Sequence, residues 1–154
     1  MLEVRIETVI EAPAERVWQI LMDFGAYPGW NPFVRRIHGT PEAGSRLDVQ
    51  LGAPGTRPMR FRPRVMAVVP NREFRWLGHL GIPGLFDGEH IFGLTSLGPR
   101  STRFVQRERF RGIFLPVLAR RLEKDVRRGF DEMNRALRDR AVRVSLSDDG
   151  TGKG

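Results

Sequence analysis

The sequence predicts a two-layer α+β domain in which one antiparallel sheet is covered by a long C-terminal helix. Two observations indicate this fold class. Residues 33–108 contain short alternating segments joined by turns of Gly, Pro and Asn, which is typical of consecutive antiparallel strands. Residues 115–141 then carry apolar side chains at every third or fourth position, which is typical of an amphipathic helix.

The chain starts with a strand and two short helices. Residues 3–11 alternate between apolar and polar side chains, which predicts a strand. Pro13 then opens a helix at a position where its missing N–H costs nothing. The segment 26–33, AYPGWNPF, can hold only a short second helix, because two prolines and a glycine interrupt it.

Six further strands follow, which makes seven in all. They are expected over 33–39, 45–51, 58–69, 72–80 and the two arms of a hairpin within 90–108. Apolar residues stay on one face of the sheet in the following pairing: Ile37 with Leu47, Leu51 with Met59, and Val69 with Phe74. The phase of strand 33–39 stays open, so Arg35 faces either the inside of the domain or solvent.

The hairpin carries polar residues on its apolar face. Folding it about Gly98 and Pro99 gives these pairs: Leu94 with Phe104, Phe92 with Gln106, and His90 with Glu108. A carboxylate and an imidazole left unpaired in an apolar core would cost about 1–3 kcal/mol each. We therefore expect this face to form the wall of a ligand cavity.

The last helix is expected to be about 40 Å long at 1.5 Å per residue, enough to cross the sheet. Gly129 lies near its middle, where glycine costs about 1 kcal/mol relative to alanine. Either this glycine packs closely against a neighbour or it leaves room for a ligand. Residues 1–143 are expected to form a single domain, and the polar stretch 144–154 a disordered tail.

Strand parity predicts where a cavity would open. Alternate turns of a meander share an end, so loops 52–58 and 81–87 should lie with residues 111–116, where the long helix begins. These loops carry apolar residues that either pack the end of the core or gate a ligand: Ile82, Leu85, Phe86, Ile113 and Phe114.

Composition excludes several classes of chemistry. The chain of 154 residues has no cysteine, so disulfides, thiol catalysis and cysteine-ligated zinc are excluded. Its three histidines are not at metal-ligand spacing, and no Walker loop, G-x-G-x-x-G or G-x-S-x-G motif is present, so we expect neither a metal nor a cofactor. No apolar run approaches a membrane span and the N-terminus is charged from residue 3, so we expect a cytoplasmic protein that is a monomer or a weak homodimer.

The net charge of +8 comes almost entirely from arginine. The arginines are spread through strands and the last helix rather than gathered with aromatics, which argues against nucleic acid as a partner. The back of the sheet nevertheless offers a basic surface for an acidic partner, formed by Arg60, Arg62, Arg64, Arg75, Arg107 and Arg109.

The order of these elements resembles the START-like (SRPBCC) superfamily, and within it the polyketide cyclase/dehydrase-type members. The resemblance covers about residues 3–142 and is carried by IEAPAERVW at 10–18, YPGWNPF at 27–33, HIF at 90–92, FVQRE at 104–108 and Gly112 to Pro116. It implies a helix-grip fold, in which a curved seven-stranded sheet wraps around the C-terminal helix and encloses a deep apolar cavity. The superfamily includes lipid carriers, aromatase/cyclases, quinone-binding proteins and chaperone activators, so the resemblance does not select one activity.

Three functions stay open. The first is binding of a hydrophobic small molecule such as a lipid, polyketide, quinone or isoprenoid. The second is a cyclase or dehydratase in which Glu108 and His90 act as acid and base, although the two could equally form a structural pair. The third is an interaction module that uses the basic sheet surface. The candidate ligand contacts, whose aromatic members could also be plain core, are Trp30, Asn31, Phe33, Arg35, Phe61, Phe74, Trp76, Phe92, Phe104, Gln106, Leu118, Leu122 and Val126.

Overall fold

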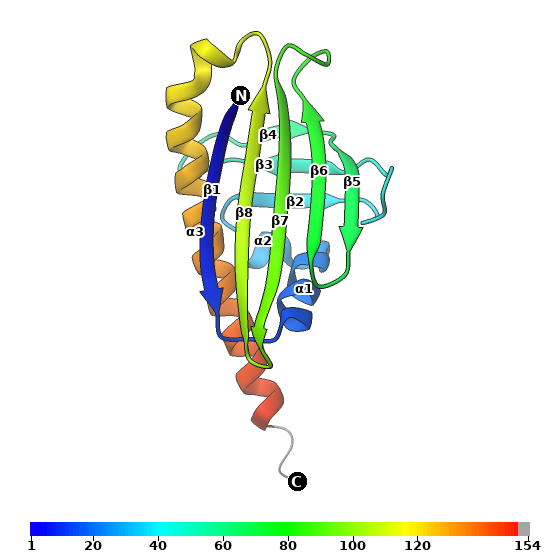
Figure 1. The fold of residues 1–154 in the computed structure, drawn as a ribbon, viewed down its shortest axis with the longest axis vertical. Helices are drawn as coiled ribbons and strands as arrows, with labels where there is room; N and C mark the ends of the chain where they lie inside the picture. Colours follow the sequence, from blue (N-terminus) through cyan, green and yellow to red (C-terminus); the bar gives the residue numbers. More distant parts are fainter. Residues whose placement is uncertain (151–154) are drawn as a thin grey trace.

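A long helix lies along a curved antiparallel sheet in the computed structural model, which describes residues 1–150 and the side chains of residues 1–143 (Figure 1). The strands are β1 (Leu2–Ile10), β2 (Val34–His38), β3 (Asp48–Leu51), β4 (Met59–Phe61), β5 (Arg64–Val69), β6 (Glu73–His79), β7 (Asp87–Gly98) and β8 (Ser101–Arg111). The helices are α1 (Ala14–Met22), the 3₁₀ turn η1 (Phe24–Ala26), α2 (Tyr27–Trp30) and α3 (Leu115–Gly150).

The predicted α+β class is confirmed, but the strands form two sheets instead of one. Five strands pair in the order β1-β8-β7-β6-β5, and β2, β3 and β4 form a smaller sheet. The predicted strand 58–69 is broken between β4 and β5 at Pro63, which has no N–H to give to a ladder. Hydrogen bonds from Leu47 to Pro63 and from Val65 to Ser45 (2.9 and 2.8 Å) connect the two sheets at this corner.

The hairpin register is confirmed, because His90 pairs with Glu108, Phe92 with Gln106 and Leu94 with Phe104. The pairing of Leu51 with Met59 is also confirmed. Two other predicted pairs were wrong. Ile37 pairs with Val49 instead of Leu47, and Val68, not Val69, pairs with Phe74.

Bulges change which side chains of these two strands face the core. The ladder shifts by one residue between Val65 and Ala67, which turns Val68 toward the core and leaves Val69 exposed. A second shift lies between Val34 and Arg36, so the strand follows neither predicted phase, and Phe33, Val34 and Ile37 are all buried.

The inner face of α3 packs on β1 and β8 through fully buried residues, namely Phe130, Met133, Leu137 and Ala141. Gly129 allows a close approach, because a Cβ added there would overlap the ring of Phe33. Close packing, not ligand room, therefore accounts for this glycine. The helical backbone continues to Gly150, beyond the predicted end near residue 141. The predicted tail, 144–154, begins where side chains are no longer described, and residues 151–154 lie outside the described part of the chain.

Candidate functional site

A pocket of about 100 Å³ lies between the larger sheet, the β3–β4 pair and the first half of α3. Few voids in a well-packed core are larger than a water molecule, so this space is larger than an ordinary packing defect. Its lining is almost entirely apolar, with a single carboxylate. The lining residues are Phe33, Leu51, Met59, Phe61, Gly78, His79, Leu80, Phe86, Gly88, Glu108, Phe110, Leu122 and Val126.

Two glycines that face each other keep this space open. Gly78 of β6 pairs with Gly88 of β7, and both lie on the inward face of their strands. A Cβ at Gly78 would lie 3.1 Å from the ring of Phe61, and a Cβ at Gly88 would lie 2.7 Å from Oε1 of Glu108. Side chains at these two positions would therefore occupy the floor of the pocket.

Five of the residues predicted from sequence line the pocket, namely Phe33, Phe61, Glu108, Leu122 and Val126. Leu118 lies one turn before Leu122 and is outside the lining, with 45% of its surface exposed. Of the segments predicted to share an end, loop 81–87 and residues 111–116 do meet. Leu80 donates to the carbonyl of Phe86, and the Ile113 and Phe114 amides donate to the carbonyls of Gly84 and Leu85.

The aromatic residues predicted along the sheet lie deeper than the pocket. Phe74, Trp76, Phe92 and Phe104 are at most 1% exposed and pack against one another, with ring centroids 5.3–6.2 Å apart for the neighbouring pairs. None of the four is part of the lining. The structure therefore places them in the core, and the open space is confined to one end of the sheet.

Glu108 is the carboxylate in the pocket wall. Its side chain is 12% exposed, and Oε2 lies 2.9 Å from Nδ1 of fully buried His90. This contact is close but is not aligned as a hydrogen bond, so Nδ1 has no hydrogen-bond partner among the described residues. Two oppositely charged or proton-sharing groups at this distance stabilise each other strongly where water is excluded.

A chain of buried polar groups continues from His90 into the core. His90 Nε2 lies 3.0 Å from Oε1 of Gln106. Gln106 Nε2 donates to Oδ1 of Asn134 at 2.7 Å, and Asn134 Nδ2 donates to Oγ1 of Thr8 at 3.2 Å. His90, Gln106 and Asn134 are at most 1% exposed, so each needs these partners. Gln106 is thus a link between His90 and α3 and does not line the pocket.

Another predicted contact, Asn31, has structural partners instead. Asn31 Oδ1 accepts hydrogen bonds from the amides of Phe33 and Val34, which fixes the start of β2. Its Nδ2 and the indole Nε1 of Trp30 are buried without a hydrogen bond among the described residues. Neither residue lines the pocket.

Arg35 does not face Glu108. Its guanidinium donates to the carbonyls of Ala53 and Thr56 at 2.8 and 2.9 Å, because the β3–β4 loop leaves these carbonyls without ladder partners. Arg35 and Glu108 therefore do not form an ion pair.

Sequence reasoning missed the lining residues Leu51, Met59, Gly78, His79, Leu80, Gly88 and Phe110. The signal that could have found the two glycines is their inward phase on neighbouring strands. His79 lies 2.7 Å from Asp87, which also accepts from the amide of Gly84 at 3.1 Å. The hydrogen bond from His79 holds the pKa of Asp87 below its ordinary value, and the Gly84 amide lowers it further.

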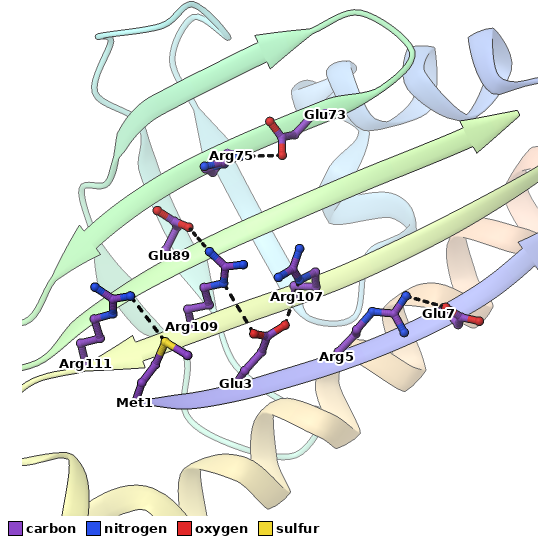
Figure 2. A network of polar contacts seen from close by, with 10 residues as sticks. All are labelled: Met1, Glu3, Arg5, Glu7, Glu73, Arg75, Glu89, Arg107, Arg109 and Arg111. Carbon is purple, nitrogen blue, oxygen red and sulfur yellow. Dashed lines mark hydrogen bonds and ion pairs between the residues drawn. The ribbon is translucent and has the colours of Figure 1, made fainter.

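The basic surface on the back of the sheet is largely balanced by acidic residues (Figure 2). Glu3 lies 2.9 Å from Arg107 and 3.6 Å from Arg109, and Arg109 is also 3.7 Å from Glu89. The hydrogen bond from Arg107 holds the pKa of Glu3 below its ordinary value. Arg75 has a partner in Glu73 at 2.7 Å. Arg60, predicted for the same surface, lies on β4 of the smaller sheet instead and pairs with Asp48 at 3.2 Å. The positive charge that this surface offers to a partner is therefore smaller than the composition indicates.

Within the described residues, no three His, Cys, Asp or Glu side chains gather as a metal site. In the same part of the chain, no helix has the length and apolar character needed to cross a membrane.

Comparison with known proteins now identifies the family. Residues 1–138 match the family model described as polyketide cyclase / dehydrase and lipid transport. A search of curated proteins finds no match.

Solved structures share the fold at low sequence identity. A START superfamily protein from Mycobacterium smegmatis is 24% identical, with a TM-score of 0.74 over 92% of this chain and 98% of that chain. The Zhui aromatase/cyclase from Streptomyces sp. R1128 is 20% identical, with a TM-score of 0.72 over 92% and 94%. A point mutant of norcoclaurine synthase from Thalictrum, in complex with a transition-state analogue, is 13% identical, with a TM-score of 0.72 over 94% and 96%. Because the family model spans nearly the whole chain, this protein belongs to the polyketide cyclase / dehydrase and lipid transport family.

Proposed function

We propose that this protein binds a hydrophobic small molecule, of the lipid, polyketide, quinone or isoprenoid type, in the pocket beneath the first half of α3. One observation carries the proposal: the lining is apolar except at Glu108 and His79. An apolar ligand gains about 2.5 kcal/mol for each 100 Å² of its surface that leaves water. A single polar group on such a ligand would find its partner in Glu108.

The loops at the mouth support access to the pocket. Ile82, Ile113 and Phe114 are 64%, 71% and 51% exposed, although their loops are joined by backbone hydrogen bonds. Apolar side chains at a mouth give a hydrophobic ligand a favourable surface before it enters. Because the space is about 100 Å³, a large ligand would require these loops to separate from the start of α3.

Filling the pocket tests the proposal. Val126 lies in the lining and is 8% exposed, so Val126→Phe should occupy part of the space. Val117, on the same helix but 83% exposed, provides the matched control Val117→Phe. Displacement of a fluorescent fatty-acid analogue and native mass spectrometry would measure binding. We expect weaker binding in Val126→Phe alone; no uptake by the wild type, or equal uptake by both variants, would reject the proposal.

Acid–base catalysis is the second candidate function, and the contact between Glu108 and His90 favours it. A carboxyl group in an apolar wall, 2.9 Å from an imidazole, can hold or release a proton next to a bound carbonyl compound. This chemistry suits aldol-type cyclisation followed by loss of water. It requires the same bound ligand, so it adds to the binding proposal.

Glu108→Gln separates the two candidates. Glutamine keeps the shape of the side chain but cannot transfer a proton, so probe binding should change only severalfold. Cyclisation of a small β-dicarbonyl substrate, followed by chromatography, should fall by about 10²- to 10⁴-fold if Glu108 is the acid–base group. Turnover that is unchanged in Glu108→Gln would remove catalysis by this residue and leave the binding proposal intact.

A further inference from the structure

The chain of buried hydrogen bonds behind the pocket has a direction, because each side-chain amide in it has one donor end and one acceptor end. Asn134 donates to Thr8 through Nδ2, and its Oδ1 accepts from Gln106. Gln106 therefore turns its oxygen, Oε1, toward Nε2 of His90 at 3.0 Å. An oxygen without a hydrogen can only accept, so Nε2 must carry the imidazole proton.

This tautomer determines what lies between His90 and Glu108. With its proton on Nε2, a neutral imidazole presents a lone pair at Nδ1, only 2.9 Å from Oε2 of Glu108. Two unprotonated acceptors at this distance repel each other, and the repulsion is removed when one of the two groups is protonated. The pair therefore holds one proton in addition to that on Nε2, either on Glu108 or on Nδ1, and is electrically neutral in both cases.

Loss of that additional proton would favour the opposite direction of the hydrogen-bond chain. The proton that remains would then reside on Nδ1 and face the Glu108 carboxylate, and Nε2 would accept from the amide nitrogen of Gln106. Both amides would turn by half a rotation, and Thr8 would donate to Asn134 where it now accepts. A hydroxyl can serve in either role, so Thr8 permits both directions.

We propose that Asn134 and Thr8 are positioning residues that couple the direction of this chain to the protonation of the His90–Glu108 pair. The direction in the structure keeps the pair neutral, and the reverse direction leaves it with one negative charge. A neutral pair in an apolar wall favours an uncharged ligand over a cationic one. This inference deepens the proposed function and rests on it, because it assigns a ligand class to the pocket.

The surroundings of the pair contribute one other titratable group. Trp76 lies opposite His90 on β6, and the ring of Phe130 on α3 lies 5.1 Å from the imidazole. Val4 of β1 lies opposite Glu108. The remaining groups in the lining are apolar except for His79 of β6, which is held by Asp87 of β7. Among the described residues that face the pair, His79 alone could add a competing proton.

Nitrogen NMR of the ligand-free protein tests the coupling, because protonated and bare imidazole nitrogens resonate far apart. We expect His90 to carry its proton on Nε2 at neutral pH. Once the pair has lost its additional proton, the proton that remains should be found on Nδ1. The measurement needs no ligand, so its failure is distinct from failure of the binding proposal.

Two variants and two controls sharpen this test. In Asn134→Asp the new carboxylate only accepts, so it holds Gln106 in its present direction and Nε2 should stay protonated throughout. Asn31→Asp adds the same charge to a buried asparagine outside the chain and should behave as wild type. If Asn134→Asp does not fold, Thr8→Val removes the last partner of Asn134, whereas Thr8→Ser keeps a hydroxyl.

An unpaired amide nitrogen is costlier to bury than an unpaired carbonyl oxygen, so Thr8→Val should favour the reverse direction. We expect the ratio of Nε2–H to Nδ1–H forms to fall by about five- to tenfold, equivalent to one neutral hydrogen bond. Thr8→Ser should keep the wild-type ratio. A proton on Nδ1 throughout in the wild type, or profiles that neither Asn134→Asp nor Thr8→Val changes, would overturn the inference.

Discussion

Replacing Gly129 by alanine should destabilise the protein, although alanine is the better helix former. The exchange contributes about 1 kcal/mol of helix propensity. The new Cβ, however, would overlap the ring of Phe33, which packs edge-on against Phe130 with centroids 5.5 Å apart. The ring has no free space on its Phe130 side, so it would have to move toward the pocket that it lines.

Overpacking of a buried site costs about 1–3 kcal/mol, and an overlap with a held aromatic ring places Gly129→Ala at the upper end. After the propensity gain, we expect a net loss of about 2 kcal/mol in the free energy of unfolding. Urea denaturation followed by circular dichroism would measure it. With an m-value of about 2 kcal/mol per molar urea, the midpoint should fall by about 1 M.

Gly29 provides the matched control. It lies in helix α2, and a Cβ added there meets no atom within 4 Å. Gly29→Ala should therefore keep the propensity gain and stabilise the protein by up to about 1 kcal/mol. Shortening the ring in Phe33→Leu should recover part of the loss in the Gly129→Ala background. A Gly129→Ala variant as stable as the wild type would refute this expectation, because the overlap would then carry no energetic cost.

Further predictions concern buried and paired polar groups. Tyr27 is the single tyrosine, its hydroxyl donates to the carbonyl of Leu21 at 2.7 Å, and burial raises its pKa. Phenolate absorbance should hence appear in an alkaline titration only as the protein unfolds; earlier ionisation would contradict this burial. Tyr27→Phe should cost about 1–3 kcal/mol, measured by urea denaturation, because it leaves a buried carbonyl unpaired. The pKa of Asp87 is lower in the folded than in the unfolded protein. Its contact with His79 therefore stabilises the fold at pH values above the unfolded pKa, which is near 4, and this stabilisation is lost as the pH falls through the folded pKa. Asp87→Asn should accordingly lower the thermal midpoint at neutral pH, and this effect should shrink as the pH falls below about 4 and through the folded pKa of Asp87. An effect of equal size at every pH would argue against the ionic contribution.

The register of the β7–β8 hairpin was predictable over 90–94 and 104–108. The two arms alternate regularly there, because the irregularity between Ser96 and Gly98 lies nearer the turn, and one register places the apolar residues on a shared face. His90 and Glu108 were therefore brought together by local pattern alone. Their contact at 2.9 Å is the part of the candidate site that sequence reasoning identified.

The smaller sheet was less predictable because its strands are irregular. The bulge between Val34 and Arg36 and the break at Pro63 each add or remove one residue from a ladder. A shift of one residue exchanges the two faces of a strand. For this reason Arg35, whose direction stayed open, could be placed only by its bonds to the β3–β4 loop.

The pocket and the chain behind it depend on residues that are far apart in the sequence. Thr8 and Asn134 are 126 residues apart, and each alone resembles an ordinary half-buried or helical polar residue. The same holds for Gly78 and Gly88, which keep the pocket open only because they face each other on neighbouring strands.

Local pattern by itself determined the fold class, the inward face of each regular strand and the apolar stripe of the last helix, since alternation and helical spacing are properties of neighbouring residues. Only the tertiary structure decided that the aromatic residues fill the centre of the domain and that the space remains at one end. The physical reason is that a cavity is a difference between the volume enclosed by the elements and the summed volume of side chains from all of them, and no single segment contains that difference.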